Sequence, residues 1–359
     1  MGLYDNLRKI DPYVPGEQPQ NKDVIKLNTN ENPYPPSSAV LDVKERYNTD
    51  NLKLYPDPDI KKLSDELAIY FNGKYNTNLT RENVFVGVGS DDVLSVAFQT
   101  FFNSGKAILF PDVTYSFYDV WADLYKIDYD VVPLREGFLI DPEDYNRDCG
   151  GVVIANPNAP TTVALGLDAI EKILDDNSEV VVIVDEAYVD FGGESAIKLL
   201  EKHENLVVVQ TYSKSRSMAG ARIGYALGGY RLIKAMEDVK FSINSYTLSN
   251  LQIAMGVASL RDEDYFKESV EKIISTRDRA KEKFKELGFN CPDSKTNFLF
   301  VTHESIPAVE IFEYLKTKNI FVRYFRKPAT IANYLRVTIG TDEQMDALFK
   351  ALEEYIDKK

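Results

Sequence analysis

Two charged residues stand where apolar runs end. Asp185 directly follows the run Val180–Val184, and Lys214 closely follows Leu206–Gln210. In an open parallel sheet, ligands bind beyond the carboxyl ends of the strands. An acid at the end of an apolar strand is costly to bury unless it meets a cation, and its alternative role is to cap the next helix. A lysine there is either a solvated loop charge or a nucleophilic amine.

A further group of residues could hold a phosphate. Ser90 and Asp91 follow the run Asn83–Val88 and a glycine. They open a helix whose free N–H groups can bind an anion, although both residue types are also ordinary helix caps. Arg222 comes eight residues after Lys214 and supplies a cation that suits phosphate.

One ligand uses all these groups, pyridoxal 5′-phosphate (PLP). Lys214 would bind its aldehyde, and Asp185 would keep its pyridine nitrogen protonated, which makes the ring an electron sink. Tyr188 and an asparagine of residues 156–161 (NPNAPT) could hydrogen-bond the ring hydroxyl, although NPNAPT also fits a simple proline-rich turn. Arg222, the serines and the helix terminus would hold the phosphate.

Alternating strand and helix signals must position these residues. Continuous apolar runs are typical of strands buried on both faces, as in a parallel sheet flanked by helices. The sequence therefore predicts a doubly wound, mainly parallel α/β sheet between residues 83 and 227. The expected strands are Asn83–Val88, Ala107–Phe110, Val152–Ala155, Val180–Val184 and Leu206–Gln210, and the expected helices are Ile60–Phe71, Asp91–Phe102, Tyr115–Tyr125 and Leu167–Leu174.

The length of 359 residues suggests about two domains. Residues 1–50 are expected to form an N-terminal arm and linker, because the first 60 residues are rich in Pro, Asn and Asp and fit extended chain with short turns. Residues 51–250 are expected to form the large PLP-binding domain and residues 251–359 a smaller α+β domain. The elements expected in that smaller domain are Asp262–Leu287, Asn297–Val301, Ala308–Lys318, Ile320–Tyr324, Leu335–Ile339 and Asp342–Asp357.

Composition excludes several other classes of protein. The 42 basic and 56 acidic residues give a net charge of −14, which argues against nucleic-acid binding. Two cysteines and two histidines without metal-ligand spacing argue against a metal site and against a histidine-dependent triad. No signal peptide or run of about 20 apolar residues is seen, so we expect a cytoplasmic protein without a membrane partner.

The order and spacing of these segments resemble fold-type-I PLP-dependent aminotransferases. VDEAY and SKSRSMAGARIGYALG are typical of that class, and NTNENPYPPS with the PYVPG arm narrows the resemblance to the histidinol-phosphate group. The similar segments run from residue 4 to residue 341. The resemblance implies a type-I PLP-dependent transferase fold and exchange of an amino group between histidinol phosphate and glutamate or 2-oxoglutarate, in histidine biosynthesis. It also implies a homodimer with composite active sites.

The resemblance assigns roles by position. Lys214 would be the Schiff-base lysine and proton shuttle, and Asp185 would pair with the pyridinium. The remaining implied contacts are Tyr188 with the ring hydroxyl, Tyr115 stacked on the ring, Ser90, Asp91, Ser213 and Arg222 around the phosphate, Tyr55 at the neighbouring subunit's phosphate, and Arg336, Arg323 and Tyr13 at the substrate anion.

One departure concerns the asparagine loop. The family commonly reads NPNNPTG, whereas this chain has Ala159 and Thr162 in place of the second asparagine and the glycine. Either Asn158 takes over the bond to the ring hydroxyl or that bond is lost. A neutral hydrogen bond contributes ~1 kcal/mol, so its loss would tune cofactor binding without abolishing it.

Other functions share the same motifs. An aromatic or broad-specificity amino-acid aminotransferase, or a phosphoamino-acid decarboxylase, would carry the same cofactor residues. VGVGSDD partly resembles a dinucleotide-binding loop but lacks the full GxGxxG pattern. A non-catalytic, Rossmann-like nucleotide-binding protein is the remote alternative, because it leaves Asp185, Lys214 and Arg222 unexplained.

Overall fold

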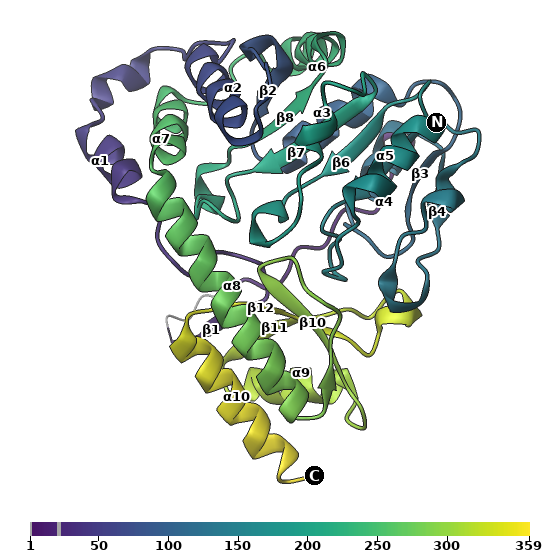
Figure 1. Ribbon diagram of the computed structural model, residues 1–359, viewed down its shortest axis with the longest axis vertical. Coiled ribbons are helices and arrows are strands. Elements are labelled where there is room, and N and C mark those ends of the chain that lie inside the picture. The colour runs from purple at the N-terminus through teal and green to yellow at the C-terminus, as the bar shows by residue number, and fades with distance from the viewer. Residues whose placement is uncertain (1, 20–22) are drawn as a thin grey trace.

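The computed structural model describes residues 2–19 and 23–359, in which two sheets lie one above the other (Figure 1). The larger has seven strands in the order β2-β8-β7-β6-β5-β3-β4, and the smaller has five in the order β1-β11-β12-β10-β9. Among the described residues, no helix combines the length and apolar character needed to cross a membrane.

The larger sheet is parallel except for β8, which runs antiparallel to both its neighbours, β2 and β7. Its central strands are buried along their whole length, as the continuous apolar runs predict. The strands are β2 (Val84–Gly87), β3 (Ile108–Pro111), β4 (Tyr129–Val132), β5 (Gly151–Ala155), β6 (Val182–Asp185), β7 (Leu206–Thr211) and β8 (Gly224–Gly228).

Helices cover both faces of this sheet (Figure 1). Ile183 and Val207 pack on one side with α3, α4 and α6, whereas Val182 and Val208 pack on the other side with α2, α5 and α7. This alternation confirms the predicted doubly wound α/β fold. The helices are α2 (Lys61–Tyr75), α3 (Ser90–Phe101), α4 (Tyr118–Tyr125), α5 (Leu167–Asp176), α6 (Tyr230–Ile243) and α7 (Asn250–Arg261).

The smaller sheet has a hydrophobic core of its own, built with α8, α9 and α10. Its strand β1 comes from the N-terminal part of the chain and pairs in parallel with β11. The elements are β1 (Ile25–Leu27), β9 (Phe289–Asn290), β10 (Phe298–His303), β11 (Ile320–Tyr324), β12 (Leu335–Thr338), α8 (Glu263–Glu286), α9 (Ala308–Thr317) and α10 (Asp342–Ile356).

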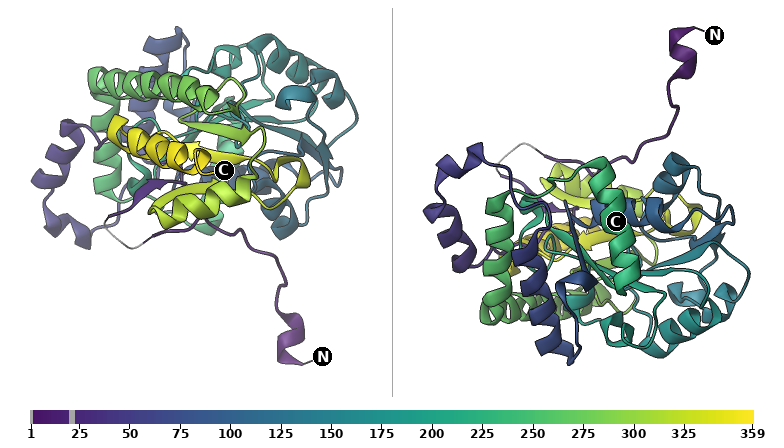
Figure 2. Two further views of the ribbon diagram at one scale, coloured as in Figure 1. Left: turned by 90° about the horizontal axis from the view of Figure 1, so that it is seen from below. Right: turned by 90° about the horizontal axis from the view of Figure 1, so that it is seen from above.

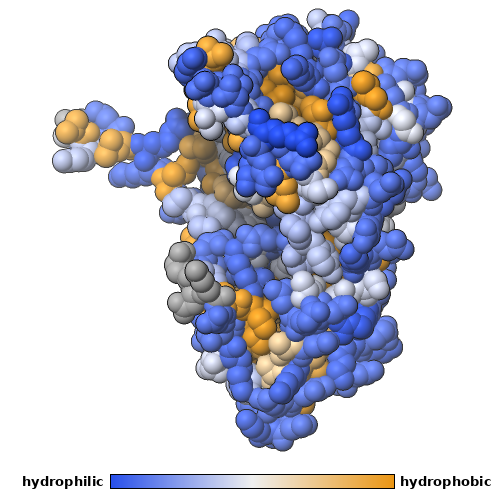
Figure 3. Space-filling model, turned by 90° about the vertical axis from the view of Figure 1, so that its left-hand side faces the viewer, coloured by the Kyte–Doolittle hydropathy of each residue, from blue (hydrophilic) through white to orange (hydrophobic). Residues whose placement is uncertain are grey.

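The first 60 residues are more ordered than predicted. The expectation of extended chain with turns is wrong for α1 (Ser38–Arg46), which begins after two prolines and buries Val40. The segment β1 is extended as predicted, but it is paired within the smaller sheet. Tertiary packing explains the helix, because α1 lies against α7. The first residues project away from the body of the molecule (Figures 2 and 3). Residue 1 and residues 20–22 of the predicted arm lie outside the described residues, and the domain limits stay a prediction.

Candidate active site

A cavity of about 980 Å³ lies at the carboxyl ends of the parallel strands, with walls from both sheets. Pro111, Ala155 and Asp185 end the strands β3, β5 and β6 on its floor. Most of the side chains singled out from the sequence meet here. They are Tyr13, Ser90, Asp91, Tyr115, Asp185, Tyr188, Ser213, Lys214, Arg222, Arg323 and Arg336.

Asp185 is a buried carboxylate at the end of β6, with 5% of its surface exposed. Its Oδ2 accepts a hydrogen bond from the Tyr118 hydroxyl at 2.9 Å, and its Oδ1 accepts one from the Ala187 N–H at 3.2 Å. Burial raises the pKa of Asp185 to about 6, although both hydrogen bonds and Lys214 act in the opposite direction. A bound cation beside this carboxylate would relieve that unfavourable burial.

Lys214 is half-buried in the loop that follows β7. Its Nζ lies 5.6 Å from the centre of the Tyr188 ring. Asn32 fixes the loop, because its Nδ2 donates to the Lys214 carbonyl at 3.2 Å and to the Ser215 carbonyl at 3.3 Å. The amine is therefore held at the cavity wall by a segment that precedes the large sheet in sequence.

The N-terminus of α3 meets the β7–β8 connection and forms a cradle for an anion. A Cβ on Gly224 would lie 2.3 Å from the Ser90 nitrogen, so only glycine permits this approach. Gly89 has a φ of 85°, and a Cβ there would lie 2.5 Å from Arg222 Nη2. Arg222 Nη1 in turn lies 3.5 Å from the Ser213 hydroxyl oxygen. These hydroxyl, guanidinium and N–H donors suit a phosphate.

Asp91 and Tyr115 form a pair beside this cradle. The Tyr115 hydroxyl donates to Asp91 Oδ1 at 2.7 Å, and Arg222 Nη2 lies 3.7 Å from Asp91 Oδ2. Burial, followed by the nearby Asp91 carboxylate, raises the pKa of Tyr115 well above its usual range. Tyr115 therefore stays a neutral phenol whose ring faces the cavity.

Arg336 of β12 brings a cation to the opposite wall. Its Nη2 donates to the Asn28 carbonyl at 2.9 Å, and its buried Nε has no hydrogen-bond partner among the described residues. No carboxylate within the described ranges lies in ion-pair distance of this guanidinium. Burial lowers the pKa of Arg336, and the neighbouring Arg323 adds to that effect. A half-buried guanidinium in this state is suited to binding an anionic ligand.

Arg323 and Tyr13 also line the cavity. Arg323 pairs in register with Arg336 across β11 and β12, and its Nη2 lies 3.5 Å from the Val14 carbonyl. The Tyr13 ring stacks on Phe117 with 4.1 Å between the ring centres. The N-terminal arm thus covers one side of the cavity with an aromatic side chain.

Two of the predicted residues do not line this cavity. Asn158 is buried, and its amide is engaged by the Val113 carbonyl, the Thr161 hydroxyl and the Thr114 hydroxyl. Ala159 stands at the wall instead, so this chain presents no amide there. Tyr55 is 80% exposed and stacks on Tyr246, with 4.6 Å between the ring centres. The roles predicted for Asn158 and Tyr55 stay predictions.

Sequence reasoning missed the residues that support the site. Tyr118, the first residue of α4, lies three positions after Tyr115 and donates a hydrogen bond to Asp185, but a tyrosine within an aromatic segment predicts only a core position. Asn30 donates to the Tyr188 hydroxyl at 2.9 Å, and Asn32 holds the Lys214 loop. The sequence signal that could have indicated them is the segment NTNEN, in which asparagine occurs at every second position.

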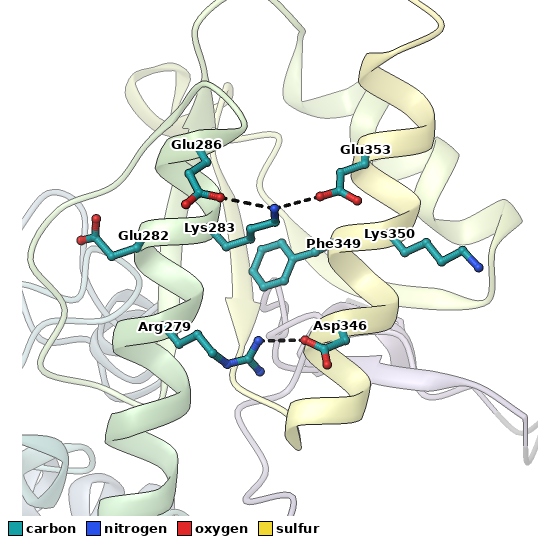
Figure 4. Close-up of a pocket in the computed structure, with 8 residues that line it drawn as sticks. All are labelled: Arg279, Glu282, Lys283, Glu286, Asp346, Phe349, Lys350 and Glu353. Carbon is teal, nitrogen blue, oxygen red and sulfur yellow. Dashed lines mark hydrogen bonds and ion pairs between the residues drawn. The ribbon is translucent and has the colours of Figure 1, made fainter.

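A second hollow, of about 380 Å³, lies between α8 and α10 (Figure 4). Five of its charged side chains face one another: Lys283 lies between Glu286 and Glu353, and Arg279 contacts Asp346. Lys283 and Arg279 are therefore already paired at an exposed surface, where such pairs contribute little, and Lys350 points away from them. The chemistry of the molecule lies in the larger cavity.

Comparison with known proteins agrees with this geometry. The family model of class I and II aminotransferases matches residues 22–352. The chain therefore belongs to the class I and II aminotransferase family, whose members are PLP-dependent transaminases acting on small molecules. The donors around Ser90 and Arg222, the buried carboxylate of Asp185 and the amine of Lys214 fit the phosphate, pyridinium and aldehyde of PLP.

Two relatives similar over the whole chain carry the same name. The histidinol-phosphate aminotransferase of Brachyspira hyodysenteriae is 49% identical over 355 residues, covering 99% of this chain and 98% of the relative. The histidinol-phosphate aminotransferase of Lactococcus lactis subsp. cremoris is 49% identical over 359 residues, covering 100% of this chain and 99% of the relative. The solved histidinol-phosphate aminotransferase of Sinorhizobium meliloti in complex with PLP has a TM-score of 0.82 at 24% identity, covering 93% of this chain and 91% of that one. This last likeness shows the fold.

Proposed function

We propose that this chain exchanges an amino group between L-histidinol phosphate, or its keto form imidazole acetol phosphate, and glutamate or 2-oxoglutarate, in histidine biosynthesis. The full-length relatives that are 49% identical support the substrate. The observation that carries the proposal is the cavity itself, which brings together the amine of Lys214, the carboxylate of Asp185 and the guanidinium of Arg336. A transaminase needs these three groups at one place.

Lys214 moves the proton in this proposal. PLP, when bound, supplies an aldehyde that captures amino groups and a ring that accepts the electrons of a broken Cα–H bond. The Lys214 amine takes the proton from the substrate Cα and returns it on the other side of the transferred nitrogen. Asp185 keeps a proton on the ring nitrogen, because an ionised carboxylate at this buried position is stabilised by a cation.

The other cavity residues hold and orient the cofactor. Ser90, Ser213 and Arg222 would bind its phosphate, with Asp91 beside them. Tyr115 would lie against the ring. Tyr188, whose ring is already next to Lys214, would contact the ring hydroxyl.

Arg336 would bind the anion of either substrate. Histidinol phosphate carries a phosphate and glutamate a carboxylate, and the planar guanidinium can bind either group with two hydrogen bonds. Arg323 and Tyr13 would complete this end of the site, since both line the cavity near Arg336.

The working enzyme would be a homodimer with composite active sites. Tyr55 and Tyr246 stack on each other while 80% and 44% exposed, and Leu52, Leu54 and Ile243 are exposed beside them in sequence. Apolar surface of this kind is typical of an interface. Tyr55 would reach the phosphate in the partner's site, and the projecting arm (Figure 2) would lie on the partner. The cytoplasmic location stays a prediction.

One spectroscopic experiment tests the substrate. Histidinol phosphate alone is added to the PLP-loaded protein, and we expect the visible absorbance of the bound cofactor to fall. Addition of 2-oxoglutarate should restore it, because the two half-reactions run in sequence. A band that resists histidinol phosphate but bleaches with phenylalanine or aspartate would identify an aromatic or broad-specificity aminotransferase. Release of carbon dioxide from a phosphoamino acid would indicate a decarboxylase.

A further inference from the structure

The segment NTNEN, residues 28–32, touches three groups of the site with its three asparagines. The Asn28 carbonyl accepts from Arg336 Nη2 at 2.9 Å, Asn30 Nδ2 donates to the Tyr188 hydroxyl at 2.9 Å, and Asn32 Nδ2 donates to the Lys214 carbonyl at 3.2 Å. The segment thus connects β12 of the smaller sheet with the cofactor residues of the larger one.

The orientation of the Asn30 amide is determined by Thr338. The Asn30 N–H lies 3.0 Å from Thr338 Oγ1 and can only donate, so Thr338 accepts there. The Thr338 hydroxyl proton is then free to be donated to Asn30 Oδ1, at 3.1 Å. Reversing the amide would leave this buried hydroxyl proton without an acceptor among the described residues, at a penalty of about 1–3 kcal/mol. Nδ2 of Asn30 therefore faces Tyr188.

This orientation fixes the direction of the hydrogen bond at Tyr188. An amide N–H can only donate, so the Tyr188 oxygen accepts from Asn30 and its own proton points elsewhere. No group in residues 2–19 or 23–359 is recorded as accepting that proton, and Tyr188 lines the cavity beside Lys214. The proton is thus available to an acceptor inside the cavity.

We propose that Asn30 is a positioning residue that makes Tyr188 a hydrogen-bond donor toward the cofactor's ring oxygen. This inference rests on the proposed PLP-dependent function and adds to it the group that sets the polarity of the Tyr188 contact. Asn30 also lines the cavity, and the double-mutant cycle below distinguishes an action through Tyr188 from a direct contact with the ligand.

The backbone holds Asn30 firmly in this place. Asn30 is 1% exposed and has a φ of 57°, a conformation that asparagine and aspartate tolerate better than other side chains. Its carbonyl accepts a hydrogen bond from Asn297 Nδ2 at 3.0 Å. Aspartate at position 30 would preserve the shape and the backbone but would replace the donor by an acceptor.

The test is a double-mutant cycle between Asn30→Asp and Tyr188→Phe. In the first variant the Tyr188 proton is drawn to the new carboxylate, and in the second it is removed. Each single change should weaken PLP binding to the apoprotein about five-fold, the equivalent of one hydrogen bond. Each should also shift the pH titration of the bound cofactor's visible absorbance in the same direction. The double variant should show no further change in either measurement.

A second variant and a matched control complete the experiment. Thr338→Val removes the hydroxyl that orients the amide, so it should weaken PLP binding in wild type but not in the Tyr188→Phe background. Asn177→Asp is the control, because this buried amide donates to the Tyr145 and Ile173 carbonyls away from the cavity. It should leave PLP affinity unchanged.

The outcomes separate this inference from the proposed function. If Asn30→Asp and Thr338→Val weaken PLP binding equally with and without the Tyr188 hydroxyl, Asn30 does not act through Tyr188 and the inference is wrong. Unchanged PLP affinity and titration in Asn30→Asp would overturn it as well. Failure of the wild-type protein to bind PLP would instead overturn the proposed function, and the inference with it.

Discussion

Replacing Asp185 by asparagine should stabilise the apoprotein and weaken cofactor binding at the same pH. Asparagine keeps the size of the side chain. It can still accept from the Ala187 N–H, and it can donate to the Tyr118 hydroxyl. The substitution therefore removes the buried negative charge and little else.

The magnitude follows from the pKa of Asp185, which burial raises from 3.8 to about 6. The folded apoprotein holds this proton more tightly than the unfolded chain, so stability falls as pH rises from about 4 and the loss is complete above about 7. The difference between the two values corresponds to ~3 kcal/mol. We therefore expect Asp185→Asn to raise the free energy of unfolding of the apoprotein by up to ~3 kcal/mol at pH 8 and to have little effect at pH 4.

Urea unfolding of the PLP-free wild type and variant at several pH values measures the difference in the free energy of unfolding. A spectroscopic titration with PLP measures the expected loss of cofactor affinity. Removing the carboxylate partner of the buried pyridinium should reduce PLP affinity by ~3–5 kcal/mol. A variant that is less stable than wild type at pH 8, or a stability difference that does not change with pH, would refute the argument that Asp185 is a buried carboxylate without a cationic partner in the apoprotein.

Three other substitutions, the last with a matched control, have defined expectations. Lys214→Ala should reduce turnover by at least ~10²–10⁴-fold, because it removes the proton carrier, and a rate near wild type in a steady-state assay would exclude that role. Arg336→Lys should lower kcat/KM for both histidinol phosphate and 2-oxoglutarate by ~10–100-fold, since lysine keeps the charge but loses the two-pronged geometry; a kcat/KM unchanged from wild type for both substrates would contradict it. Gly224→Ala should destabilise the protein by ~1–3 kcal/mol or more in urea unfolding, whereas Gly220→Ala, where a Cβ meets nothing within 4 Å, should change stability by less than ~0.5 kcal/mol.

The large sheet could be predicted because its signals are local. A strand buried on both faces is apolar throughout, so β5, β6 and β7 are visible as continuous runs. The rule that ligands bind at strand ends then predicts Asp185 and Lys214 at one site. Only the family resemblance predicts Arg336 as a site residue, because it lies within a strand of the other sheet and its neighbours in sequence do not indicate a binding site.

The supporting contacts could not be predicted because they join distant parts of the chain. Strand β1 pairs with β11, although most of the chain separates them, and no feature of the residues Ile25–Leu27 indicates which strand they pair with. The same holds for Asn30, whose partners Tyr188 and Thr338 are 158 and 308 residues away. The loop around Asn158 shows the opposite case, because the motif was visible but packing turned its amide toward Val113 and Thr161.

Asp185 differs from other buried charged residues in what surrounds its carboxylate. Glu186, next to Asp185, is as deeply buried, and burial raises its pKa to about 7. Yet it accepts hydrogen bonds from Ser195, the Ala196 N–H and Gln210, and it does not line the cavity. Asp185 and Arg336 do line it, with opposite charges contributed by different sheets and no ionic partner within 4.0 Å among the described residues. A ligand with a cation at one end and an anion at the other would neutralise both, so its binding would couple the two sheets across the cavity.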